Sequence, residues 1–128
     1  HQQQVILMKR SGGALQVIQR MNVAHTPVSV LVNDDGKTCS ITSLWSRQLT
    51  LLTLSNATLG KETRNSSKEM QAPRLLVKRV IDLPFAPRKQ LFLKSTQTLI
   101  VADSFGGKLA ILDYHRGKLK ICTASCRE

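Results

Sequence analysis

The sequence predicts an all-β fold of short antiparallel strands, and three observations support this prediction. Apolar and polar residues alternate with the two-residue period of strands, whereas helical spacing is scarce. The short apolar runs are bounded by turn residues. The same pattern of strands and turns returns from Pro27 to Pro87, an offset of 60 residues without a gap. The first two observations give the strand class, and the third indicates a repeat protein.

Eleven short strands are predicted, separated by glycine-containing turns. The strongest turn signal is Asp34–Lys37, because Gly36 can adopt a positive φ at no steric cost. Ser11–Gly13 and Phe105–Lys108 are further hairpin turns. The predicted strands are Val5–Met8, Leu15–Ile18, Arg20–Val23, Val28–Val32, Cys39–Thr42, Leu49–Leu54, Leu75–Leu83, Leu91–Leu93, Leu99–Ala102, Leu109–Asp113 and Leu119–Cys122.

At the offset of 60 residues, hydrophobic class and turn positions stay in phase. The matched pairs include Leu31 with Leu91, Ile41 with Val101, Trp45 with Phe105, and Leu52 with Leu112. We also expect residues 11–18 to be an earlier copy of residues 105–112. The polar stretch 56–73 has the composition of a surface insertion. Without about 20 residues there, the period falls toward about 40, the size of a four-stranded propeller blade.

The predicted architecture is a β-propeller segment of about two to three four-stranded antiparallel blades, forming a single partial domain over residues 1–128. Residues 1–24 would supply strands two to four of a blade. Residues 25–84 would form a full blade carrying the insertion 56–73, and residues 85–128 the next blade. A β-sandwich with accidental self-similarity is the alternative, and the gapless register disfavours it. Because blades bury their faces on one another, we expect a longer propeller, completed by blades of the same polypeptide or of another copy.

Two stretches carry a resemblance to a known family. Residues 5–54 read VILMKRSGGALQVIQRMNVAHTPVSVLVNDDGKTCSITSLWSRQLTLLTL, and residues 80–113 read VIDLPFAPRKQLFLKSTQTLIVADSFGGKLAILD. Their order of strands and turns resembles the YVTN-type β-propeller repeats of bacterial extracytoplasmic proteins. The resemblance implies a seven-bladed, cytochrome d1-like or lactonase-like propeller in the periplasm or outside the cell, often fused to cytochrome c. Ser95-Thr96 replaces the Asp-Gly turn, and the YVTN core is degenerate.

The candidate ligand-binding residues are His25 and Arg88, which belong to equivalent segments entering the innermost strand. In a propeller these segments lie near the central channel, where we expect a protein or small-molecule ligand to bind. Turn chemistry and a solvated arginine are the alternative interpretation. For Trp45 and Phe105, packing between blades is favoured over ligand stacking. No catalytic set or metal cluster stands out, and His115 is expected in an exposed turn.

The three cysteines and the net charge limit which cofactors and partners are expected. Cys39 is expected to be a small buried hydrophobe. Cys122 and Cys126 match neither a zinc pair nor the C-x-x-C-H haem motif, so no cofactor is expected in this segment, and a disulfide between them stays open. The net charge of +11 is compatible with a polyanion or nucleic-acid partner. The basic residues are scattered along the sequence, however, which disfavours nucleic acid.

No apolar run approaches the roughly 20 residues of a membrane span.

Three functions follow as hypotheses. The first is a non-catalytic binding or scaffold platform in an extracytoplasmic protein, linked to electron-transfer domains as in the family that it resembles. The second is part of a propeller enzyme, an oxidoreductase or a lactonase, whose catalytic residues lie outside this segment. The third is a basic binder of polyanions or nucleic acid.

Overall fold

The computed structural model of the chain describes residues 3–55 and 73–123, and these residues form strands and turns without a helix. The ten strands are β1 (Gln4–Ser11), β2 (Ala14–Asn22), β3 (Pro27–Val32), β4 (Thr38–Ser43), β5 (Gln48–Ser55), β6 (Arg74–Asp82), β7 (Pro87–Leu93), β8 (Thr98–Asp103), β9 (Lys108–Asp113) and β10 (Lys118–Thr123). Since the described part contains no helix, it offers no helix that could cross a membrane.

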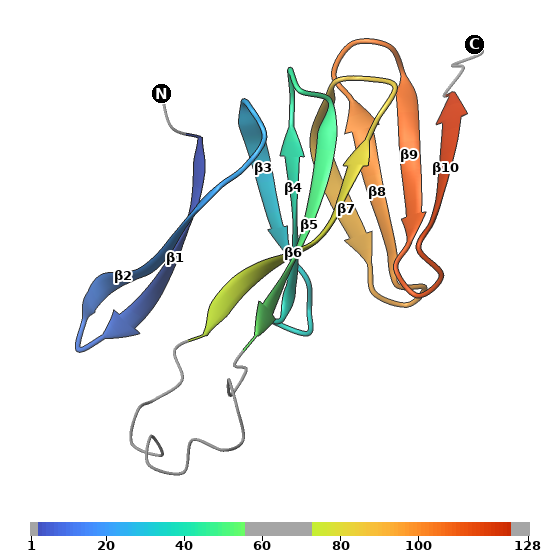
Figure 1. Cartoon of the computed structure of the whole chain (residues 1–128). Coiled ribbons are helices and arrows are strands. Elements are labelled where there is room, and N and C mark those ends of the chain that lie inside the picture. The colour runs from blue at the N-terminus through green and yellow to red at the C-terminus, as the bar shows by residue number, and fades with distance from the viewer. Residues whose placement is uncertain (1–2, 56–72, 124–128) are drawn as a thin grey trace.

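The strands form three separate antiparallel sheets (Figure 1). A two-stranded sheet, β1-β2, is the leading hairpin. The middle blade has the order β3-β4-β5-β6, and the last blade has the order β7-β8-β9-β10. In both blades each strand pairs with its neighbour in sequence, which is the meander of a propeller blade. The predicted fold class is confirmed: the chain is an all-β propeller segment with two whole blades and part of a third.

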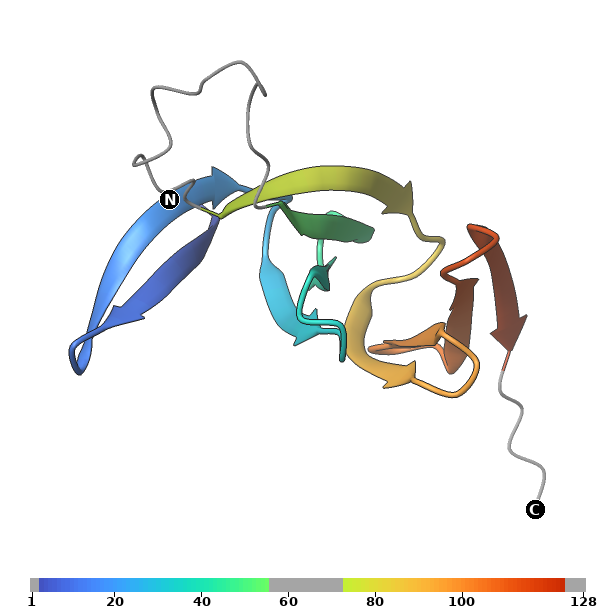
Figure 2. The ribbon, with the colours of Figure 1, turned by 90° about the horizontal axis from the view of Figure 1, so that it is seen from below.

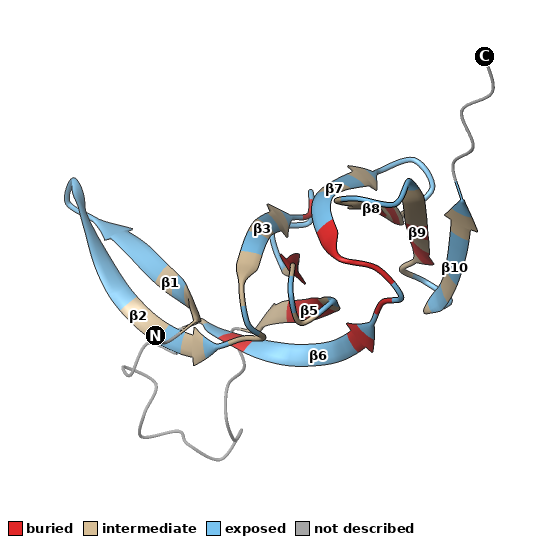
Figure 3. Ribbon diagram, turned by 90° about the horizontal axis from the view of Figure 1, so that it is seen from above, coloured by how far each residue is buried: buried red, intermediate tan, exposed pale blue. Residues whose placement is uncertain are grey.

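The sheets lie side by side along an arc (Figure 2). The first strands of the two whole blades, β3 and β7, lie along one side of this arc, and the outer strands β2 and β6 lie along the other (Figure 3). The middle blade therefore presents one sheet face to the leading hairpin and the other face to the last blade. This stacking decides which side chains are buried.

The leading hairpin corrects the predicted strand count. Arg20–Val23 was expected as a separate strand, but β2 continues unbroken to Asn22 and pairs along its length with β1. Residues 3–23 therefore hold two strands, where residues 1–24 were expected to hold three. The prediction failed because β2 has an extra residue, Ile18, at a β-bulge, which shifts the two-residue alternation of apolar side chains although the strand continues.

Strand register identifies β1 and β2 as strands three and four of their blade. Gln4 pairs with Asn22 as Gln48 pairs with Asp82. A β-bulge follows Leu7 in β1 and Leu51 in β5. The matching of residues 11–18 with 105–112 was therefore wrong. It aligned two Gly-Gly turns that join different strand pairs, β1 to β2 in the hairpin and β8 to β9 in the last blade.

The predicted insertion lies between β5 and β6. In the leading hairpin, the equivalent turn is only Gly12-Gly13, and both glycines adopt the positive φ of a tight two-residue turn. In the middle blade, Ser55 still pairs with Arg74, so residues 56–73 close the same hairpin. Residues 56–72 lie outside the described part of the chain. The insertion lengthens one turn and leaves the blade intact.

The main core fills the interface between the middle and last blades (Figure 3). Its buried members come from both blades and from the connector between them. They are Leu49, Leu51, Ile81, Leu83, Phe85, Leu99, Val101, Ala110 and Leu112. A smaller cluster, formed by Cys39, Ile41, Leu52 and Leu75, faces the leading hairpin. Cys39 is buried, as predicted, and burial raises the pKa of its thiol.

Candidate ligand-binding face at the loop end of the blades

Two kinds of connector meet at one end of each blade. The first enters the innermost strand (residues 23–26 and 83–86), and the second joins the second strand to the third (residues 44–47 and 104–107). They are tied together by equivalent backbone hydrogen bonds of 2.8 Å, from Leu44 N to Thr26 O and from Ser104 N to Ala86 O. We call this end of the molecule the loop end. It holds most of the residues that the sequence singled out.

His25 lies in the first connector of the middle blade, and its side chain is exposed. The Ser46 hydroxyl donates to the His25 carbonyl oxygen over 2.9 Å, and Thr26 adopts a φ of 59°. The Thr26 N–H also donates to the side-chain oxygen of Gln3, so this connector is bonded both to the following loop and to the segment that precedes β1. Phe85 occupies the equivalent position in the last blade and is buried in the core between the blades. The equivalent side of the middle blade, where His25 lies, faces the leading hairpin.

Arg88 is the second residue of β7, and its side chain is exposed. Its carbonyl oxygen accepts a hydrogen bond of 3.1 Å from the Thr42 hydroxyl, which joins the last blade to the middle blade. Among the described residues no hydrogen bond or ion pair joins His25 to Arg88. The role of both residues in ligand binding stays a prediction.

The structure does bring Trp45 and Phe105 together. The two rings come from equivalent loops of adjacent blades and stack with centroids 6.0 Å apart and planes 19° apart. This contact agrees with the predicted packing between blades. Yet Trp45 is 64% exposed and Phe105 is 72% exposed, so most of this aromatic surface faces solvent. The pair is therefore both a bridge between two blades and an open apolar platform.

Asp103 fixes the loop that carries Phe105. Its two carboxylate oxygens accept backbone hydrogen bonds from Phe105 N at 3.0 Å and Gly106 N at 2.8 Å. A Cβ at Gly106 would lie 2.5 Å from the nearer Asp103 oxygen, so a larger residue would disturb this cap. The neighbouring Ser104 hydroxyl is buried and has no hydrogen-bond partner among the described residues. The backbone that carries the Phe105 ring is thus fixed by the Asp103 carboxylate.

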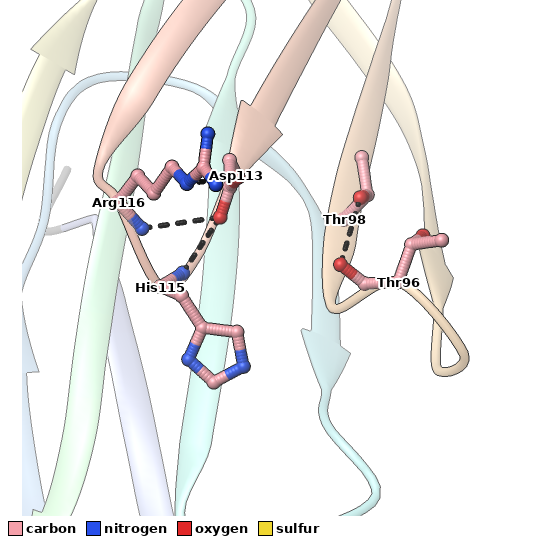
Figure 4. Close-up of polar contacts among 5 residues, drawn as sticks. All are labelled: Thr96, Thr98, Asp113, His115 and Arg116. Atoms are coloured by element: carbon pink, nitrogen blue, oxygen red, sulfur yellow. Dashed lines mark hydrogen bonds and ion pairs between the residues drawn. The ribbon is translucent and has the colours of Figure 1, made fainter.

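His115 lies at the opposite end of the last blade, in the turn from β9 to β10. Asp113 accepts backbone hydrogen bonds from His115 N at 2.9 Å and Arg116 N at 3.1 Å, and the His115 ring points away from that carboxylate (Figure 4). These bonds, that from Arg116 first, lower the pKa of Asp113. The exposed-turn prediction for His115 is confirmed, because the residue lies in the turn between β9 and β10 and its side chain is exposed.

The described residues offer no metal site, since no three of their histidine, cysteine, aspartate and glutamate side chains gather closely enough. Among the described residues, Cys39 and Cys122 form no disulfide. Cys126 lies outside the described residues, so its pairing with Cys122 stays an open prediction. What the loop end offers chemically is an aromatic surface with polar and basic neighbours.

Comparisons with known proteins support the architecture. No protein-family model matches the chain, and no curated protein matches it. Two solved structures resemble it at 16% sequence identity over 94% of its length: a protein from Lactobacillus plantarum, with a TM-score of 0.68, and the periplasmic gluconolactonase PpgL of Pseudomonas aeruginosa, with a TM-score of 0.69. The chain spans 35% and 33% of their respective lengths. At this identity the likeness shows the fold alone: the chain corresponds to about a third of a β-propeller.

Proposed function

We propose that this propeller segment is a non-catalytic binding platform, and that a ligand binds at its loop end. The observation that carries the proposal is the exposed stack of Trp45 on Phe105, which joins two blades and still leaves most of both rings in contact with solvent. Large exposed aromatic side chains are costly unless a partner covers them, and they are enriched where ligands and proteins bind.

The surroundings of the stack suggest the chemistry of the ligand. Arg47 is exposed in the same loop as Trp45. A ligand with an apolar face and polar or anionic groups at its edge would match an exposed aromatic surface with a guanidinium group in the same loop. Sugar lactones present a ring face of C–H groups with hydroxyl groups at its edge, and open-chain sugar acids such as gluconate carry a carboxylate for the guanidinium group. The likeness to a gluconolactonase makes gluconate and gluconolactone reasonable first probes.

The chain contains a single tryptophan, so fluorescence reports directly on the proposed site. We expect gluconate or gluconolactone to change Trp45 emission saturably, and Phe105→Ala to weaken that binding by roughly tenfold, the equivalent of about 1.4 kcal/mol. Leu15→Ala is the matched control, because Leu15 is 68% exposed but lies on the leading hairpin. A linear, non-saturating emission change, or equal binding by both variants, would contradict the proposal.

The second candidate is a propeller enzyme, an oxidoreductase or a lactonase, to which this segment contributes only part of the site. The fold likeness to a gluconolactonase favours the lactonase version. It predicts that gluconolactone hydrolysis requires a longer polypeptide than residues 1–128. A longer polypeptide that binds the lactone without hydrolysing it would instead favour the platform.

We propose an extracytoplasmic location for the whole protein, supported by the likeness to a periplasmic protein. The seven-blade count and the link to cytochrome c domains are part of the same proposal and rest on the resemblance to YVTN-type repeats. A polyanion partner remains the third candidate because of the net charge of +11. It predicts salt-sensitive retention on heparin.

A further inference from the structure

The middle blade is covered unequally on its two faces. Toward the last blade its side chains join the main core. Toward the leading hairpin, β3 exposes Val28, Val30 and Val32, and Val30 is 55% exposed. A mainly apolar cavity of about 240 Å³ opens there between β1 and the middle blade, lined by residues that include Val5, Leu7, Val30 and Val32. We call this space the open cleft.

Pseudo-symmetry shows which elements would fill the open cleft. The leading hairpin supplies strands three and four of a blade, as its register with β5 and β6 shows. In the middle blade, the other edge of β5 pairs with β4, whereas among the described residues β1 pairs only with β2. The edge of β1 that corresponds to the paired edge of β5 therefore lies open to strand addition. The missing elements are strands one and two, an antiparallel hairpin.

The closed interface shows how such a hairpin is recognised. Gln90 of β7 reaches into the inner hairpin of the middle blade. Its amide nitrogen donates to Ser29 O and Ser29 Oγ at 3.1 Å and to Ser40 O at 3.0 Å, while its amide oxygen accepts from Ser40 Oγ at 2.5 Å. Val30 occupies the equivalent position 60 residues earlier, and it pairs with Ile41 as Gln90 pairs with Val101. Valine can make none of these bonds, and a serine facing it would be buried without a partner.

We propose that the open cleft binds a two-stranded antiparallel hairpin of the same polypeptide, lying outside residues 1–128, which pairs with β1 and presents apolar side chains to Val30. The hairpin thus differs from the inner hairpin of the middle blade, which presents Ser29 and Ser40 to Gln90. The proposal rests on the propeller architecture of the proposed function and is independent of the ligand at the loop end.

A second copy of the chain is a poorer occupant. Its inner strand pairs are β3-β4 and β7-β8, and both are already hydrogen-bonded along their outer edges to β5 and β9. Neither pair could add to β1 unless its own blade opened. The one inner pair that presents serines to its neighbour, β3-β4, also has the wrong chemistry for Val30. A hairpin from elsewhere in the polypeptide has neither obstacle, and the chain spans only about a third of the propellers that it resembles.

The experiment grafts a hairpin in front of the chain. Residues 26–47 are joined directly to Gln4, which reproduces the junction of Arg47 with Gln48 in the middle blade. One graft keeps the serines, and the other carries Ser29→Val and Ser40→Val in the grafted copy only. Each of the two grafts is joined to two hosts, the native chain and a chain with Val30→Gln. The thermal unfolding midpoints of these four grafted proteins are compared with those of the two ungrafted hosts.

We expect the apolar graft to raise the unfolding midpoint of the native chain by roughly 5 °C or more. The serine graft should raise the unfolding midpoint of the native chain less than the apolar graft does. On the Val30→Gln host, the serine graft should give the larger increase. Equal shifts on both hosts, or no shift with either graft, would overturn the proposal. So would self-association of the ungrafted chain that Val30→Gln abolishes, because the occupant would then be a second copy.

A second measurement does not depend on the graft folding. A synthetic peptide of residues 26–44 with Ser29→Val and Ser40→Val is added to the intact chain, and amide hydrogen exchange is followed. The backbone amides of Val5–Leu7 should become protected, and the serine-bearing peptide should protect them less. Unchanged exchange in β1 would contradict strand addition. Neither outcome affects the Trp45 titration, so the two proposals can fail separately.

Discussion

The middle and last blades have the same strand order and comparable sequences, yet they differ in burial. Leu49 of the middle blade is fully buried, whereas its equivalent Leu109 in the last blade is half-buried. Leu31 packs against the core, whereas its equivalent Leu91 is 56% exposed. The middle blade has neighbours on both sides, and the last blade has one among the described residues. Burial in this fold therefore depends on the adjacent blade more than on the residue itself.

The largest test of this comparison is a pair of leucine truncations. Leu49→Ala should lower the free energy of unfolding by about 2–5 kcal/mol, because it leaves a cavity in a closed interface. Leu109→Ala should cost about half as much or less, since its side chain is already partly in water. Denaturant unfolding of the two variants measures both values. Similar losses would mean that the blades are equally covered.

A second test concerns the polar contact across the closed interface. Gln90→Ala leaves the Ser29 and Ser40 groups without their partner and should cost about 1–3 kcal/mol. Gln16→Ala, at an exposed position of β2, is the matched control and should change stability by less than about 0.5 kcal/mol. The two variants are compared by denaturant unfolding. If the Gln90→Ala chain were as stable as the control, the side chain at this position would not select what packs against it. The inference that Val30 requires apolar side chains in the open cleft would then lose its support.

The smallest effect is expected at the turn between the first two strands of each blade. Asp35 accepts backbone hydrogen bonds from Lys37 N at 2.8 Å and Thr38 N at 3.0 Å, and these bonds, that from Lys37 first, lower its pKa. The equivalent residue in the last blade is Ser95, which has no charge.

Because the folded pKa of Asp35 lies below its unfolded value, its contribution is present above pH of about 4 and is lost as the pH falls through the folded pKa. Asp35→Asn should therefore flatten the decline of stability between about pH 4 and pH 2, whereas Ser95→Ala should leave it unchanged. Free energies of unfolding measured across this range test both expectations. An unaltered slope in Asp35→Asn would show that the turn carboxylate does not couple to folding.

Much of the architecture could be predicted from the sequence because strands and turns are encoded locally. Gly36 and the Gly12-Gly13 pair adopt positive φ in the turns where they were expected. The 60-residue repeat correctly matched β3, β4 and β5 with β7, β8 and β9. The leading hairpin was misassigned because a Gly-Gly dipeptide marks a tight turn without saying which two strands the turn joins.

The contacts between blades could not be predicted in the same way. Trp45 and Phe105 were recognised as equivalent residues, but equivalence does not place two rings in contact. The bonds made by Gln90 link residues about 50 and 60 positions apart, so only the assembled interface reveals them. The sequence contained one indication of this polar contact, because Gln90 occupies the position at which the preceding repeat has Val30.

The hairpin between β5 and β6 has a practical consequence. Ser55 and Arg74 remain paired although 18 residues separate them, whereas the same strand end in the leading hairpin closes with Gly12-Gly13 alone. This corner thus tolerates changes in length with little entropic penalty, since closure cost grows slowly with loop size. It is a natural position for displaying a foreign epitope or a fluorescent label, and evolution can diversify it without disturbing how successive blades stack.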